Sequence, residues 1–218
     1  MIKLAVFDLD GTLLDTLDDL TDAVNHAMAS AGFATRTRER VREIIGNGVY
    51  RLIQDAVPAE KREDAALLDE IIAVYRAYYA SHQTDKTAPY PGVLELLTAL
   101  KEKGITTAVL SNKPHDNTIA LVEEYFPGLI DLAYGQREKV PRKPDPAALL
   151  NILVRAGAEK SETAYIGDSD VDIETGLAAG VVTIGVTWGF RDRDALLEAG
   201  GREFAETSDE LLKKILAI

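Results

Sequence analysis

The sequence predicts an α/β protein with a parallel sheet that is covered by helices on both faces and interrupted by a helical insertion. Two observations carry this expectation. From about residue 92 to residue 218, short apolar runs alternate with segments of helical periodicity, a pattern typical of right-handed βαβ units. Between residues 15 and 83 the apolar residues recur only at helical spacing, so we expect no strand there.

The first strand is expected in the apolar run at residues 3–9, followed by a turn at Asp10-Gly11-Thr12. About four helices should follow in residues 15–83, because glycines and Pro58 interrupt the periodic segments. A last helix should be capped by Ser208. The elements between are expected as helix 93–103, strand 105–110, helix 118–125, strand 131–134, helix 146–155, strand 163–166, helix 173–179, strand 182–186, helix 194–198 and strand 203–205.

Composition limits the classes of function. The 218 residues are 46% apolar and 28% charged, which suits one large domain or a core with a smaller insertion. The chain has no cysteine, which excludes disulfides, thiolate zinc sites and cysteine nucleophiles. No apolar stretch has the length of a signal peptide or of a membrane span, so we expect a cytoplasmic protein. The net charge of −12 argues against binding to nucleic acid or to a membrane surface.

Four polar clusters follow four of the predicted strands. Asp8 and Asp10 flank Leu9 at the end of the first strand, where residues two apart project to the same side. Each cluster also has an ordinary explanation as a turn, a helix cap or a solvated loop. However, loops beyond the carboxyl ends of parallel strands line one crevice, so we expect all four to meet there. The other three clusters are Ser111-Asn112-Lys113, Lys143-Pro144-Asp145-Pro146 and Gly167-Asp168-Ser169-Asp170-Val171-Asp172.

Such a meeting would crowd the carboxylates of Asp8, Asp10, Asp168 and Asp172 around one or two lysines, and a divalent cation would relieve their repulsion. Oxygen ligands without histidine or cysteine favour Mg²⁺. With a serine hydroxyl and a lysine nearby, phosphoryl transfer is the natural reaction. Asp8 would attack phosphorus to give an aspartyl-phosphate, and Asp10 would protonate the leaving oxygen and then activate water.

These residues resemble the four ordered motifs of the haloacid dehalogenase superfamily of phosphohydrolases. The resemblance covers essentially the whole chain, and it implies a Rossmann-like catalytic core in residues 1–15 and 86–218. It also implies an all-helical cap domain in residues 16–85. The motifs that carry it are Asp8-Leu9-Asp10-Gly11-Thr12, Ser111, Arg142-Lys143-Pro144-Asp145-Pro146 and Gly167-Asp168-Ser169-Asp170-Val171-Asp172.

The resemblance implies a role for each matched residue. Asp8 would be the nucleophile and a metal ligand, and Asp10 the acid/base and a ligand through its carbonyl. Asp168 would ligate Mg²⁺, with Asp172 supporting it. The residues expected to hold the phosphoryl group or the substrate in the core are Ser111, Lys143, Gly11, Thr12 and Asn112.

The same resemblance bears on the substrate. Dehalogenases and phosphonate hydrolases of the superfamily lack an acid at the position of Asp10, so its presence favours a phosphomonoesterase. Relatives of β-phosphoglucomutase carry a histidine at about the place of Leu20, which puts mutase activity in doubt. The segment around Gly46-Asn47-Gly48 is similar to one in phosphoglycolate phosphatases. There Asn47 and Arg51 could present donors to a substrate carboxylate.

We therefore expect a Mg²⁺-dependent phosphatase of a small phosphorylated metabolite such as 2-phosphoglycolate, as a monomer or a small homo-oligomer. A pyrophosphatase or a sugar-phosphate phosphatase or mutase would share most of these motifs. A phosphorylatable signalling receiver is a remote alternative, because its acceptor aspartate would stand on a middle strand. A catalytically dead binding protein would normally have lost one of the acids.

Overall fold

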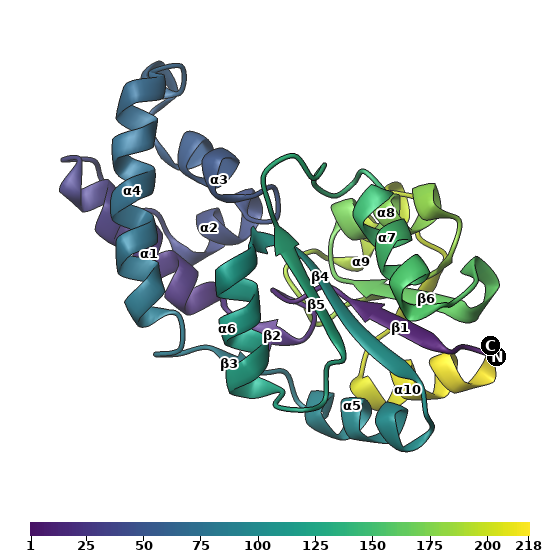
Figure 1. Cartoon of the computed structure of the whole chain (residues 1–218). Coiled ribbons are helices and arrows are strands. Elements are labelled where there is room, and N and C mark those ends of the chain that lie inside the picture. Colours follow the sequence, from purple (N-terminus) through teal and green to yellow (C-terminus); the bar gives the residue numbers. More distant parts are fainter. The chain divides into compact units, whose positions relative to one another are not determined.

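The computed structural model describes all residues, 1–218. The chain forms two compact units, one of residues Met1–Leu14 and Pro89–Ile218 and one of residues Asp15–Ala88. Figure 1 traces the chain through both units. No helix combines the length and the apolar character that crossing a membrane requires.

The larger unit contains a six-stranded sheet in the order β5-β4-β1-β6-β7-β8, in which every pairing is parallel. The central strand β1 aligns Phe7 with Val109 of β4 and with Ile166 of β6. Because this register brings several strand ends to one level, the residues that follow them become neighbours. The strands are β1 (Leu4–Phe7), β4 (Thr106–Pro114), β5 (Leu132–Gln136), β6 (Thr163–Gly167), β7 (Val182–Val186) and β8 (Glu203–Ala205).

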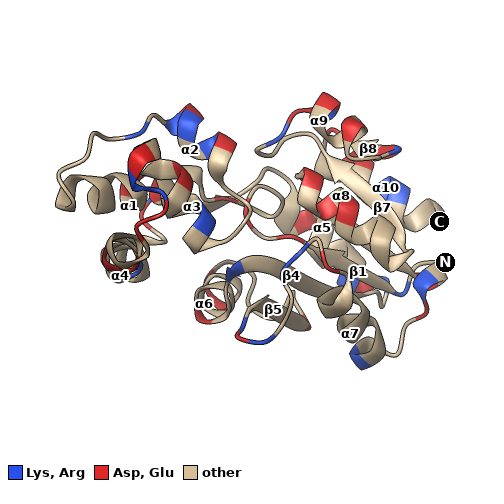
Figure 2. Ribbon diagram, turned by 90° about the horizontal axis from the view of Figure 1, so that it is seen from above, with Lys and Arg blue, Asp and Glu red and all other residues tan.

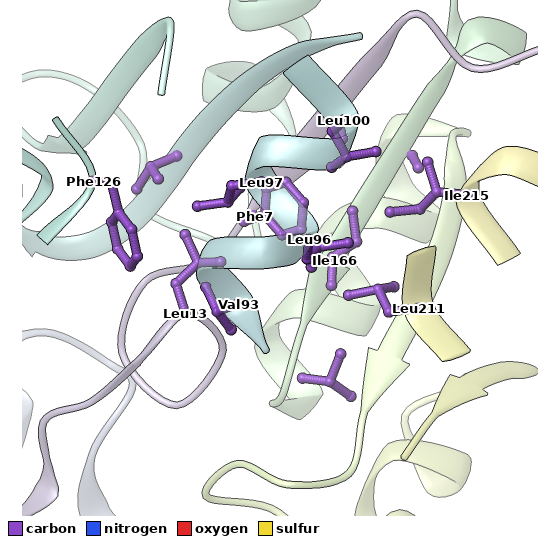
Figure 3. Close-up of a cluster of buried hydrophobic side chains, with 14 of the residues drawn as sticks. Phe7, Leu13, Val93, Leu96, Leu97, Leu100, Phe126, Ile166, Leu211 and Ile215 are labelled. Atoms are coloured by element: carbon purple, nitrogen blue, oxygen red, sulfur yellow. The ribbon is translucent and has the colours of Figure 1, made fainter. Parts of the chain in front are cut away.

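Helices cover both faces of this sheet, as the sequence predicts. On one face Phe7 and Ile166 pack against residues of α5, α6 and α10, as Figure 3 shows for part of this cluster. On the other face Val6 and Tyr165 pack against α7. Strands buried on both faces read as continuous apolar runs, which is why β1 is wholly apolar. The helices are α5 (Val93–Glu102), α6 (His115–Tyr125), α7 (Ala147–Ala156), η2 (Lys160–Glu162), α8 (Asp170–Ala179), α9 (Arg193–Glu198) and α10 (Ser208–Ala217).

The smaller unit is helical, and its two longest helices, α1 and α4, pack along each other (Figure 1). Their buried residues, such as Val24 and Met28 on α1 and Leu68 and Ile72 on α4, recur at helical spacing. The predicted count of four α-helices is right, with one additional 3₁₀ turn. The helices are α1 (Leu17–Ser30), α2 (Arg38–Ile44), α3 (Val49–Ala56), η1 (Ala59–Lys61) and α4 (Ala65–His82).

Two short strands, β2 (Leu14–Asp15) and β3 (Ala88–Pro89), form a separate two-stranded sheet where the chain passes between the units. Next to β3, the buried carboxylate of Asp19 accepts hydrogen bonds from the backbone N–H groups of Lys86 and Thr87 and from the Thr87 hydroxyl, at 2.8–3.1 Å. Asp19 therefore fixes the chain that follows α4 against α1.

Apart from the start of α6, which lies at His115 rather than at Thr118, three local predictions are wrong. Strand β4 does not end at Leu110 but continues through Ser111, Asn112 and Lys113 to Pro114, with a register shift against β5 after Leu110. Helix α8 begins at Asp170 rather than near Ile173, because the Ser169 side chain caps it by accepting from the Asp172 N–H.

The third error concerns the last helix, α10. Its N-cap is Thr207, which has an extended backbone and whose hydroxyl accepts from the N–H of Glu210. The hydroxyl of Ser208 instead donates to the carbonyl of Pro91 at 2.8 Å. The helix thus begins one residue earlier than predicted, and Ser208 joins α10 to the start of α5.

Candidate active site

Three aspartates lie together at the carboxyl ends of β1 and β6. Asp8 directly follows β1, and its N–H donates to Ile166 O at 2.8 Å, which extends the pairing with β6 by one residue. Asp168 directly follows β6, and Asp172 lies in the first turn of α8. One carboxylate oxygen from each of the three lies within 4.8 Å of the others, and all three residues are buried.

Lys143 is the cation of this cluster. Its Nζ lies 2.9 Å from Asp8 Oδ1 and donates to Asp172 Oδ1 at 2.7 Å and to the carbonyl of Leu110 at 3.1 Å. The side chain is 3% exposed. The contact with Asp8 is an ion pair without hydrogen-bond geometry, so Asp8 Oδ1 is buried without a hydrogen-bond donor. Despite the opposing effect of burial, the carboxylates of Asp172 and Asp8 raise the pKa of Lys143, so the ammonium stays charged.

Asp172 is saturated by protein donors. Its Oδ1 accepts from Lys143 and from the buried hydroxyl of Tyr165 at 2.8 Å. Its Oδ2 accepts from the backbone N–H and the hydroxyl of Ser169. A carboxylate that is already hydrogen-bonded on both oxygens is suited to positioning its neighbours.

Asp168 is held from two sides. Its Oδ1 accepts from the Thr12 hydroxyl and its Oδ2 from the Phe190 N–H, each at 2.8 Å. Two glycines make room for it: a Cβ on Gly11, which has φ +84°, or on Gly189 would lie 2.3 Å from atoms of Asp168. These positions therefore require glycine.

Burial and mutual repulsion disturb the titration of the cluster. Burial, reinforced by the charges of Asp172 and Asp168, raises the pKa of Asp8 to about 8 even though Lys143 opposes the shift. Burial and the charge of Asp172 raise the pKa of Asp168 to about 7, against the hydrogen bonds from Phe190 and Thr12. One lysine thus does not compensate three buried carboxylates.

The donor set fits a hard divalent cation. All the available ligands are carboxylate oxygens, and Asp8 Oδ1 is a buried acceptor with no hydrogen bond. Each oxygen of Asp168 accepts one hydrogen bond and so keeps a lone pair. A cation of charge +2 between Asp8 and Asp168 would offset the repulsion that raises their pKa values, and oxygen-only sites favour Mg²⁺.

Asp10 lies apart from the three clustered acids. Its Oδ1 accepts from Lys113 Nζ at 2.6 Å, and the lysine side chain is 4% exposed. The backbone of Asp10 forms a β-bridge with Leu14, and the N–H of Gly11 donates to Leu14 O at 2.8 Å. The turn after β1 thus directs Asp10 toward β4.

Two predicted site residues, Ser111 and Asn112, are buried on β4. Asn112 Nδ2 donates to Lys143 O at 3.1 Å, and Lys143 N donates to Asn112 Oδ1 at 3.0 Å. The amide therefore fixes the backbone that presents the lysine. The hydroxyl of Ser111 accepts from the Lys113 N–H at 3.2 Å.

The remaining two predicted residues belong to the helical unit. Asn47 lies in the turn between α2 and α3, where Gly46 and Gly48 both have positive φ. Arg51 lies on α3, and its Nε is 2.7 Å from Asp55 Oδ2. Its Nη1 donates to Gln54 Oε1 at 3.1 Å, so both partners are on the same helix.

Three residues at the cluster have no role in the sequence analysis: Tyr165, Lys113 and Gly189. Tyr165 lies inside an apolar strand, where an aromatic residue is ordinary core, and its bond to Asp172 depends on the packing of α8 against β6. Lys113 stands in the polar triplet after Leu110, but its partner Asp10 is 103 positions away. Gly189 stands in Thr187-Trp188-Gly189-Phe190, which resembles a segment of phosphoglycolate phosphatases, but nothing local indicates that it makes room for Asp168.

The comparisons agree with this geometry. Residues 5–186 match the model of the haloacid dehalogenase-like hydrolase family. A phosphoglycolate phosphatase of Mesorhizobium japonicum is 34% identical over 194 residues, which are 86% of this chain and 84% of the relative. Phosphoglycolate phosphatase 1 of Pseudomonas aeruginosa is 36% identical over 219 residues, 96% of this chain and 75% of the relative.

Solved structures agree as well. A protein of Haemophilus somnus, described as a predicted phosphoglycolate phosphatase, superposes with a TM-score of 0.91 at 26% identity and covers 98% of this chain and 97% of its own. The family match spans β1 to β7 and so includes all three clustered aspartates and Lys143. The chain therefore belongs to the haloacid dehalogenase-like hydrolase family, within which it is an enzyme similar to phosphoglycolate phosphatases.

Proposed function

We propose that this enzyme is a Mg²⁺-dependent phosphomonoesterase that forms an aspartyl-phosphate on Asp8, with a small phosphate ester such as 2-phosphoglycolate as substrate. The observation that carries the proposal is the environment of Asp8. Its carboxylate is paired with Lys143 and lacks a hydrogen-bond donor on Oδ1, beside Asp168 and Asp172. A nucleophile needs such a free lone pair, next to a cation that receives the charge of the phosphoryl group.

In the first step a carboxylate oxygen of Asp8 forms a bond to phosphorus while the bond from phosphorus to the ester oxygen breaks. Asp10, in its acid form, gives its proton to the departing oxygen. In the second step Asp10 accepts a proton from a water molecule, whose oxygen attacks the same phosphorus. The bond between phosphorus and Asp8 then breaks, which releases inorganic phosphate and restores the Asp8 carboxylate.

Asp8, Asp168 and the backbone carbonyl of Asp10 would hold Mg²⁺, which when bound supplies positive charge to the phosphoryl oxygens. Lys143 would donate to a phosphoryl oxygen as charge develops, and Ser111 and Asn112 would bind the same group from β4. Gly11 and Thr12 would close the site beneath it. Asp172 would hold Lys143 in place, as its 2.7 Å hydrogen bond supports.

We further propose that residues 16–85 act as a cap on a core of residues 1–15 and 86–218, with hinges at 14–17 and 85–91. Support comes from the two chain crossings, which are the short strands β2 and β3. The hydrogen bonds from Lys86 and Thr87 to Asp19 would keep the second hinge attached to α1 during closure. Closure would exclude bulk water from Asp8 while substrate is held.

The substrate is inferred from α3 and from the similarity to phosphoglycolate phosphatases. A substrate as small as 2-phosphoglycolate offers only its carboxylate beyond the phosphate. The turn at Asn47 supplies backbone N–H groups, and Arg51 carries a planar fork that suits a carboxylate. The Arg51 side chain is 57% exposed and pairs with Asp55 of its own helix, which is 15% exposed.

A panel of phosphate esters tests this function. We expect hydrolysis of 2-phosphoglycolate to exceed that of pyrophosphate and hexose phosphates, and to require Mg²⁺. Arg51→Ala should lower kcat/KM for 2-phosphoglycolate by roughly 10- to 150-fold, the value of a charge-assisted hydrogen bond, and should leave p-nitrophenyl phosphate hydrolysis nearly unchanged.

The matched control is Arg76→Ala, which removes an exposed arginine of α4. It should change neither substrate. Equal losses on both substrates in Arg51→Ala would mean that Arg51 has a structural role, and a preference for hexose phosphates would overturn the substrate assignment.

A further inference from the structure

A pocket that contains none of the clustered acids opens at the edge strand β5, between the end of β4 and α7. Its volume is about 90 Å³, which corresponds to about three water molecules. The residues that line it include three arginines and no aspartate or glutamate. Arg137 and Arg142 both lie in the loop between β5 and α7, and Arg155 is on α7.

The pocket contrasts with the composition of the chain, which carries 36 acidic and 24 basic residues. Figure 2 shows acidic and basic residues on many elements, with a basic residue on α7 and further basic residues in the loop after β5. No carboxylate lies within ion-pair distance of Arg137 or Arg155, although most other arginines of the chain have one. The three arginine side chains are exposed, so an anion can reach them from solvent and is attracted by their combined positive potential.

The guanidinium groups of Arg137 and Arg155 are held in place by contacts that leave some of their nitrogens available to a ligand. The guanidinium carbons of Arg137 and Arg155 lie 5.6 Å and 5.8 Å from the centre of the Tyr134 ring. Arg155 uses only Nε, which donates to Asn151 Oδ1 at 3.0 Å, so its two terminal nitrogens have no acceptor in the protein. Arg137 contacts the imidazole of His115 through one terminal nitrogen, which leaves its other nitrogens available.

The loop that carries Arg137 is also held in place by side-chain hydrogen bonds. Gln136 Nε2 donates to the carbonyls of Arg137 and Val140, at 2.7 Å and 2.9 Å. This side chain closes the loop on itself and sets the position of Arg137 relative to β5. An arrangement in which donors are positioned before the ligand arrives reduces the ordering cost of binding.

We propose that this pocket is a second oxyanion site, which binds a phosphate group separately from the catalytic aspartates. Arginine forks match the tetrahedral oxygens of phosphate, and here they approach from a loop and from α7. The volume admits a single phosphate group, so any organic part of a ligand would extend out of the pocket. The source is either free inorganic phosphate or the phosphate group of a metabolite.

The pocket shares a wall with the catalytic cluster. Ser111 and Asn112 line it, and Asn112 holds the backbone of Lys143 through two hydrogen bonds. An anion in the pocket would therefore lie against the segment of β4 that positions the catalytic lysine.

Isothermal titration calorimetry with inorganic phosphate, in chelator and without Mg²⁺, tests the site. Under these conditions the buried carboxylates repel phosphate, so binding reports the arginine pocket. We expect one binding event in the wild type that weakens at least tenfold in Arg155→Met and in Arg137→Met, since methionine keeps packing on Tyr134 but loses the fork. Arg155→Lys, which retains the charge, should fall between.

The matched control is Arg202→Met, an exposed arginine next to β8 at the opposite edge of the sheet, which should bind as the wild type does. Glycerol 3-phosphate in a parallel titration separates the two sources: tighter binding than phosphate assigns the site to a phosphorylated metabolite, and weaker binding assigns it to the free ion. Equal affinity in Arg155→Met and Arg202→Met, or no binding to the wild type at about 10 mM phosphate, overturns the proposal. The readout is binding rather than turnover, so the result does not depend on the proposed function.

Discussion

Replacement of Lys143 by methionine removes the single cation that Asp8 and Asp172 share. The lysine is 3% exposed and makes contacts of 2.9 Å and 2.7 Å with these carboxylates. Removing one partner of a buried ion pair costs about 3–5 kcal/mol, because the remaining charge stays uncompensated. In a chain of this size about 1 kcal/mol changes the Tm by roughly 2–4 °C, so we expect the Tm of the metal-free protein to fall by roughly 6–20 °C.

The fall in Tm caused by Lys143→Met should be larger at higher pH. Burial raises the pKa of Asp8 to about 8 from its ordinary value of 3.8, so between these values the folded state binds a proton that the unfolded state releases. Stability therefore decreases as pH rises through this range. Without Lys143, whose charge lowers the pKa of Asp8, the decrease should continue to higher pH. The Tm difference between variant and wild type should thus be larger at about pH 8.5 than at about pH 5.5.

Thermal unfolding followed by circular dichroism in chelator measures both quantities, with Lys103→Met as the control because that lysine is exposed. The double variant Lys143→Met/Asp8→Asn should recover part of the loss, since it removes one of the unpaired carboxylates. A Lys143→Met protein whose Tm stays within about 2 °C of the wild type at both pH values would refute the reasoning that this lysine compensates the buried acids.

Three further predictions concern the same site and the first helix. Asp8→Asn and Asp10→Asn should each fold normally and lose detectable turnover, since one lacks the nucleophile and the other the proton carrier; near-normal kcat in either would contradict that role. Mg²⁺ should raise the Tm of the wild type more at about pH 8 than at about pH 5.5, because the ion competes with the protons on Asp8 and Asp168. Asp168→Ala should need more Mg²⁺ for activity. An equal Tm rise at both pH values, or turnover in excess chelator, would argue against the metal site. Asp19→Ala should destabilise the protein by about 1–3 kcal/mol, because three donors of Lys86 and Thr87 lose their acceptor, and chemical denaturation that detects no loss would remove Asp19 from the set of structural residues.

Much of the fold could be predicted because its signals are local. The apolar run of β1 and the helical spacing of Leu68, Ile71 and Ile72 on α4 each lie within one element. The alternation after residue 92 is a succession of such local signals. Chain geometry then implies a parallel sheet, since consecutive strands separated by helices cross over in one direction. The errors lie at element ends, where Thr207 and Ser208 compete as caps within one residue of each other.

The sequence by itself predicted that Asp8, Lys143 and Asp168 meet, because all three follow strands whose ends lie at one edge of a parallel sheet, and the structure brings them together. The sequence could not determine which oxygens of these groups are already bonded. Only the tertiary structure decided that Tyr165 and Lys143 saturate Asp172, that Lys113 holds Asp10, and that Asp8 keeps an unbonded oxygen. The physical reason is that Lys113 and Asp10 are far apart in the chain, so their hydrogen bond depends on distances that packing sets to within about 0.5 Å. Periodicity and composition specify only which side of an element a residue faces.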